Sequence, residues 1–209
     1  MNQTYDKNRI ISFSDAVYSI AMTLLVLEVA IPSSKAIATY NSWDLLSNRI
    51  PNFIGLVVSF LVTALYWVAH LRSMRLVSTV DNKLLWLNIF LLLFIVLMPF
   101  STGFYVSGFG YVIPFVFYCF NLSAIGLLNF MMIRYIIKKE KNNPELTPLA
   151  IKWHTLTGLN ALSVWILAAI LAFILPNVAR YIFVLIFVFQ FFINRNYKRN
   201  TNKVTVEDS

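Results

Sequence analysis

The chain has 209 residues, of which 59% are hydrophobic and only 12% are charged, and its formal net charge is +8. With a mean hydropathy of +0.71, this composition excludes an ordinary soluble domain built around one core. The basic residues flank hydrophobic stretches instead of forming one long patch, so they indicate membrane topology and not nucleic-acid binding. We therefore predict an all-α, polytopic membrane protein.

The first predicted span, Ile10–Ile31, is unusually polar for a membrane helix. Its residues would rise about 33 Å, close to the hydrocarbon thickness of a bilayer, and Pro32 is expected to end it. On a helical wheel, four polar side chains fall within a sector of about 80°: Ser12, Asp15, Ser19 and Thr23. A carboxylate in hydrocarbon costs several kcal/mol unless it is paired or hydrated, so Asp15 must face protein or water. The helix is either a structural helix whose hydroxyls bond to their own backbone or the wall of a water-lined pathway.

Five further spans are predicted along the chain. Their expected bounds are 51–72, 84–105, 112–137, 153–175 and 179–194. A short interfacial helix around Trp43 should precede the second span, and Pro99 should kink or end the third. Together these elements predict one six-helix transmembrane subunit over 1–195 and a solvated C-terminal tail over 196–209.

The positive charges predict the orientation of this subunit. Of the 17 Lys and Arg residues, only Lys35, Arg49 and Arg180 fall in loops on the side opposite the termini, which leaves 14 on the other side. Cytoplasmic segments are enriched in these residues, so both termini are expected in the cytoplasm and the protein in the cell membrane. The basic cluster 134–141 is interpreted as lipid-headgroup anchors and topology determinants. A single Cys119 excludes an internal disulfide.

Motifs on the first three spans carry a family resemblance. They are Arg9, Phe13, Ser14 and Asp15 at the start of the first helix, Trp67 and His70 at the end of the second, and Asn88 in the third. These motifs resemble those of the bacterial members of the transmembrane protein 175 family of potassium channels. The resemblance implies a six-helix subunit that assembles as a homotetramer, with a central pore lined by the first helix and no re-entrant filter loop. It also implies a multi-pass protein of the bacterial inner membrane, with no cofactor and only permeant K⁺.

The same resemblance assigns roles to individual residues. Ile20, Leu24 and Leu27 would form hydrophobic layers of the pore, and Thr23 would supply a hydroxyl near the narrowest point, where K⁺ binds transiently. A ring of aliphatic side chains can gate by dewetting. A helical wheel places Leu24 about 100° from Thr23, so Ile20, Thr23 and Leu27 are the stronger pore set.

The resemblance also implies a polar network that holds the first helix against its neighbours. Its members would be Arg9, Phe13, Ser14, Asp15, Trp67, His70 and Asn88. An Arg guanidinium suits a carboxylate, and His donates or accepts near neutral pH. Glu28, at the outer end of the first helix, suits either a cation-attracting vestibule or plain solvation.

The sequence thus favours a potassium-selective channel that conducts passively. Two alternatives stay open: a proton-coupled secondary transporter that uses Asp15 and His70 as a relay, and a structural membrane subunit without transport of its own. No Gly-rich phosphate loop, nucleophile elbow or His-Glu-x-x-His element is present, so an enzyme is not expected. The Ser107–Tyr111 segment superficially resembles a carbonyl filter, but turn chemistry explains its glycines better.

Overall fold

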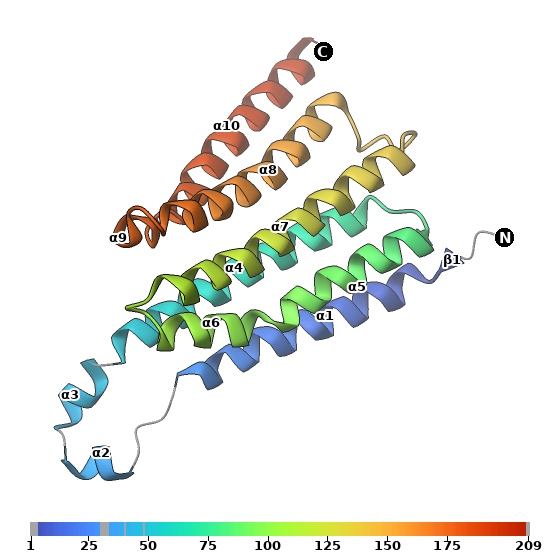
Figure 1. Ribbon diagram of the computed structural model, residues 1–209. Coiled ribbons are helices and arrows are strands. Elements are labelled where there is room, and N and C mark those ends of the chain that lie inside the picture. Colours follow the sequence, from blue (N-terminus) through green and yellow to red (C-terminus); the bar gives the residue numbers. More distant parts are fainter. Residues whose placement is uncertain (1–3, 30–33, 40, 48, 208–209) are drawn as a thin grey trace.

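The structure is a computed structural model that describes residues 4–29, 34–39, 41–47 and 49–207. It is all-α except for one antiparallel pair of two-residue strands, in which Thr4 pairs with Asp81 and Tyr5 with Val80 (Figure 1). The elements in chain order are β1 (Thr4–Tyr5), α1 (Lys7–Leu24), η1 (Leu25–Glu28), α2 (Ser34–Thr39), α3 (Ser42–Ser47), α4 (Ile50–Arg75), β2 (Val80–Asp81), α5 (Asn82–Val96), α6 (Met98–Ser107), α7 (Val112–Lys139), α8 (Pro148–Leu171), α9 (Pro176–Ala179) and α10 (Val184–Glu207).

Five helical segments of the described residues are long and apolar enough to cross a membrane. They are Lys7–Glu28, Ser42–Arg75, Asn82–Ser107, Val112–Lys139 and Pro148–Leu171. The predicted sixth span over 179–194 is not among them. Its first residues form turns after α9, α10 starts only at Val184, and this helix continues through the boundary predicted at 195/196.

Helix α8 begins earlier than the sequence predicted, because a capping residue precedes its hydrophobic run. The fifth span was expected to start at Trp153, but α8 starts at Pro148 because the Thr147 side chain caps it, accepting a hydrogen bond from the Ala150 N–H at 3.2 Å. The third span is interrupted at Leu97, two residues before Pro99, as its proline predicts. The predicted end of the first span at Ile31 and Pro32 lies outside the described residues.

The helices pack as a bundle in which α1 occupies one side (Figure 1). Helix α1 lies against α4 and α5, while α7 packs against both α5 and α8. Helix α10 returns along α8. Tyr18 and Leu25 of the first span are fully buried in the core together with Leu91 and Leu122. One side of α1 is therefore fixed by the protomer itself.

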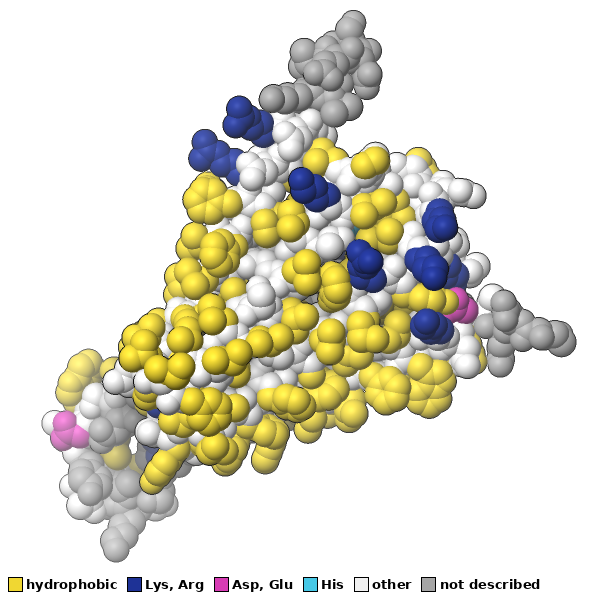
Figure 2. Space-filling view, turned by 45° about the horizontal axis from the view of Figure 1, so that its top comes forward, with side chains coloured by type: hydrophobic (Ala, Val, Ile, Leu, Met, Phe, Trp, Pro, Cys, Tyr) yellow, Lys and Arg dark blue, Asp and Glu magenta, His cyan; other side chains and the backbone are white. Residues whose placement is uncertain are grey.

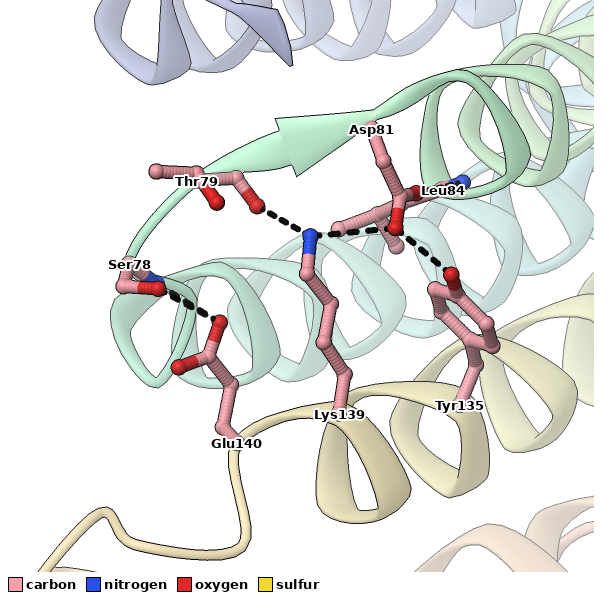
Figure 3. Close-up of polar contacts among 7 residues, drawn as sticks. All are labelled: Ser78, Thr79, Asp81, Leu84, Tyr135, Lys139 and Glu140. Atoms are coloured by element: carbon pink, nitrogen blue, oxygen red, sulfur yellow. Dashed lines mark hydrogen bonds and ion pairs between the residues drawn. The ribbon is translucent and has the colours of Figure 1, made fainter. Parts of the chain in front are cut away.

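A cluster of Asp81, Tyr135 and Lys139, here called the Asp81 cluster, joins the helix ends beside the N-terminus (Figure 3). Asp81 caps α5 by accepting from the Leu84 N–H at 2.9 Å, accepts from Tyr135 Oη at 2.6 Å and pairs with Lys139 Nζ at 3.1 Å. Partial burial favours a higher pKa for Asp81, but the hydrogen bonds from Tyr135 and Leu84 and the charge of Lys139 outweigh it and lower the pKa. Lys7 Nζ also donates to the Val77 carbonyl at 2.7 Å, which ties the start of α1 to this end.

Replacing Asp81 by asparagine should destabilise the fold by about 1–3 kcal/mol, because asparagine can still cap α5 but lacks the charge that Lys139 contacts. Since the folded-state pKa is lowered, this stabilisation is fully present above the ordinary pKa of an aspartate and is lost as the pH falls through the lowered value. Thermal unfolding of wild type, Asp81→Asn and the exposed control Asp44→Asn over a pH series tests this. If the difference in stability between wild type and Asp81→Asn stayed constant below about pH 4, this prediction would be contradicted.

Candidate functional site

The side of α1 that faces away from the bundle is exposed along its whole length. The side chains of Ile20 and Leu27 are 58% and 71% exposed, and Thr23 and Leu24 lie on the same side. Buried side chains follow the opposite side of this span, namely Ile10, Ser14, Tyr18, Ala21 and Leu25. A helix with one packed side and one apolar exposed side must meet lipid, another protein chain or a pore.

Hydroxyl groups also follow the exposed side of α1. Ser19 Oγ donates to the Asp15 carbonyl at 2.7 Å, and Thr23 Oγ1 donates to the Ile20 carbonyl at 2.9 Å. These bonds satisfy the hydroxyl protons within the helix, while the lone pairs of each oxygen stay free to face outward. Exposed oxygen acceptors at membrane depth suit a passing cation better than they suit lipid tails.

A change of helix type after Leu24 brings Leu24 and Leu27 onto one side. Residues Leu25–Glu28 form a 3₁₀ turn, in which side chains three positions apart eclipse one another. Leu24 is 42% exposed although an ideal α-helix turns it away from Thr23, and the intervening Leu25 is completely buried. The four residues predicted to line a pore, Ile20, Thr23, Leu24 and Leu27, thus share one exposed face.

A buried chain of hydrogen bonds connects α1, α4 and α5. His70 Nε2 lies 2.8 Å from Asn88 Oδ1, and Asn88 Nδ2 donates to Ser14 Oγ at 2.9 Å. Ser14 in turn donates to the Ile10 carbonyl at 2.8 Å. Since the Asn88 oxygen can only accept, His70 carries its proton on Nε2. The three side chains are at most 1% exposed, so this chain fixes α1 against both neighbours.

Asp15 is held separately, by Trp67. The indole Nε1 donates to Asp15 Oδ1 at 2.8 Å, which gives the half-buried carboxylate a protein partner. Of the network predicted from the sequence, the structure brings together Ser14, Asp15, Trp67, His70 and Asn88.

Arg9 and Phe13 do not join this network. Arg9 is exposed and forms no ion pair with any acid among the described residues. Asp15 follows Arg9 by six positions, which turns their side chains about 120° apart and places them about 9 Å apart along the helix axis. Phe13 is 61% exposed and lies on the same uncovered side of α1 as Ile20.

A second buried polar cluster, in the half of the bundle near α6, was not predicted. Thr102 Oγ1 donates to Ser59 Oγ at 3.0 Å, and Ser59 Oγ lies 3.0 Å from Tyr118 Oη. Glu28 lies close by, because a Cβ on Gly103 would overlap its carboxylate. The half-buried Glu28 is therefore packed against α6. In the sequence, Ser59 and Thr102 lie within hydrophobic spans, and this was the signal from which the cluster could have been predicted.

Comparison with known proteins identifies the segment that carries this geometry. The family model described as "Endosomal/lysosomal potassium channel TMEM175" matches residues 9–99. These residues are similar to the TMEM175 family of potassium channels. They include α1, α4 and α5, and with them both the exposed face of α1 and the hydrogen-bond chain.

Relatives extend the TMEM175 similarity. A Streptomyces collinus protein named a potassium channel is 36% identical over 98 residues, 47% of this chain and 47% of that protein. A Chryseobacterium protein that is also named a potassium channel is 29% identical over 140 residues, which are 67% of this chain and 70% of that protein. The chain thus matches about half the length of the first relative.

A solved structure shows that the likeness in fold extends beyond residue 99. The crystal structure of a lysosomal potassium-selective channel TMEM175 homologue from Chamaesiphon minutus superposes with a TM-score of 0.76, covering 91% of this chain and 97% of that one. The sequence identity is 23%, so this similarity establishes the fold. It includes the C-terminal helices that the family model does not match.

Proposed function

We propose that this protein is the subunit of a potassium-selective channel that conducts passively through a homotetrameric pore. The exposed face of α1 carries the proposal: within the segment that the TMEM175 family model matches, it presents Ile20, Thr23, Leu24 and Leu27 on one uncovered side. Four such faces around an axis would shield this apolar surface from lipid and enclose a path for ions. The names of the relatives support potassium as the permeant ion.

Conduction follows from the chemistry of this face. Rings of Ile20, Leu24 and Leu27 would make narrow apolar layers, where an ion must shed part of its hydration shell. Sodium holds its shell more tightly than potassium, so such layers favour potassium. Thr23 oxygens would replace part of the lost water beside the constriction. The buried chain from His70 to Ser14 would keep each α1 in register.

The proposed orientation places both termini in the cytoplasm of the host bacterium. The 14-to-3 distribution of Lys and Arg supports this orientation, as does the gathering of dark blue basic side chains near the N-terminal end in Figure 2. Ser107 is exposed at the opposite end. A cysteine placed there should react with an impermeant thiol reagent added outside cells. Labelling from the cytoplasm alone would show that the orientation is the opposite of the proposed one.

Ion flux through purified protein in liposomes tests the function. A channel should carry a current that reverses at the potassium equilibrium potential and needs no proton gradient. A current that appears only with an imposed proton gradient would instead identify a proton-coupled transporter. Liposomes that contain folded protein but stay silent would indicate a structural subunit.

A further inference from the structure

A groove is lined by residues of α5, α7, α8 and the loop that joins α7 to α8. Its volume is about 770 Å³, and it is open to the surface. Four basic side chains line its rim: Lys83, Arg134, Lys138 and Lys141. Its floor is apolar and includes Leu87, Phe130 and Met131.

The acids near this groove are already bound elsewhere. Asp81 pairs with Lys139, Glu140 accepts from Ser78 Oγ at 2.8 Å (Figure 3), and Glu145 pairs with Arg75 at 3.4 Å. Among the described residues, none of the four rim cations forms an ion pair. Lys83 instead lies over the ring of Tyr135, 5.0 Å from its centroid. The groove therefore holds positive charge without a protein counter-charge.

The floor of the groove leads toward the middle of α7. Leu127, Met131, Arg134 and Lys138 recur at intervals of three and four residues, so they share one face of this helix. Leu127 and Met131 are 44% and 46% exposed. The surface changes along this stripe from apolar at membrane depth to basic at the helix end. A ligand that fits it needs an anionic head and an apolar tail.

We propose that this groove binds an anionic phospholipid of the leaflet on the N-terminal side. The phosphate would lie between Arg134 and Lys138, because a guanidinium can contact two phosphate oxygens at once. Lys83 and Lys141 would contact the remaining headgroup oxygens, and the acyl chains would lie on Met131 and Leu127. Basic pockets between membrane helices on the cytoplasmic side are known to suit such headgroups. The inference needs membrane-spanning helices but does not depend on ion conduction.

Lipid binding to the purified full-length protein tests the proposal. Native mass spectrometry during titration with phosphatidylglycerol or phosphatidylcholine would compare wild type with two triple variants. The groove variant is Arg134→Gln, Lys138→Gln and Lys141→Gln. The control removes the same charge from exposed positions on α10 by Arg195→Gln, Lys198→Gln and Arg199→Gln.

Wild type should prefer phosphatidylglycerol, and the groove variant should bind it at least about tenfold more weakly, because each basic residue near an anionic headgroup contributes about fivefold. The α10 control should stay within about twofold of wild type. Equal losses in both variants, or no preference in wild type, would overturn the proposal. Displacement of the lipid by millimolar inorganic phosphate would also overturn it, in favour of a free-anion site.

Charge-conserving substitutions keep the test valid if the groove variant does not fold. Arg134→Lys with Lys138→Arg should retain phosphatidylglycerol binding, and Lys138→Gln alone should weaken it about fivefold. An unchanged affinity in Lys138→Gln would overturn the assignment. Potassium flux measured in neutral liposomes reports on the channel separately, so failure of the lipid site and failure of the proposed function are distinguishable.

Discussion

Shortening Leu27 to alanine should raise potassium conductance and lower the preference for potassium over sodium. Leu27 is 71% exposed in the protomer, so the substitution removes little packing within the subunit. In the proposed tetramer it removes four side chains from one apolar layer, which widens the layer and lets water enter. If the free-energy barrier to ion permeation falls by about 1.4 kcal/mol, the rate of permeation rises roughly tenfold.

Replacing Ile20 by asparagine should act in the same direction, because a ring of smaller, polar side chains lets water enter the path. Val184→Ala on α10, a residue that is also exposed at 48%, is the matched control and should leave both properties unchanged. Potassium and sodium fluxes in liposomes measure the effect. If both α1 variants kept wild-type conductance and selectivity, Ile20 and Leu27 would not line the pore.

Loss of the buried hydrogen-bond chain should lower the stability of the fold. Asn88→Leu keeps the branched shape of the side chain but leaves the Nε2 proton of His70 without an acceptor, and His70 is completely buried. An unsatisfied buried donor costs about 1–3 kcal/mol. Thermal unfolding in detergent should show this loss, whereas the exposed control Asn196→Leu should show little change.

A double variant separates the hydrogen bond from packing. Removing both partners, as in His70→Leu with Asn88→Leu, should cost less than the sum of the two single losses, because no buried donor is then left unpaired. Ser14 keeps its bond to the Ile10 carbonyl in each variant. Strictly additive losses would show that the bond between His70 and Asn88 contributes nothing of its own.

The hydrophobic spans could be predicted well because membrane thickness fixes their length. Five of the predicted spans correspond to the five membrane-capable segments. The last predicted span is not confirmed, since the apolar run before Asn194 is only marginally long and its first residues form turns instead of a helix. The start of the fifth span was predicted wrongly for a local reason. Thr147 caps α8 and Pro148 begins it, well before the hydrophobic run.

The site could be predicted in part. The motifs on α1, α4 and α5 pointed to Ser14, Asp15, Trp67, His70 and Asn88, which the structure brings into contact. Arg9 was misplaced because spacing along the helix carries its side chain away from Asp15. The Asp81 cluster could not be predicted, since its members come from segments far apart in sequence and meet only when α5 and α7 pack.

The most direct test of a pore lined by α1 is the current through a Thr23→Cys variant before and after treatment with a charged, impermeant thiol reagent. Cys119, the one native cysteine, is buried and should not react. Four modified cysteines would place charge and bulk in the constriction, so the potassium current should fall to near background, while a Val184→Cys control keeps its current. A Thr23→Cys current that persists after thiol titration shows complete modification would contradict the proposal that α1 lines the conduction path.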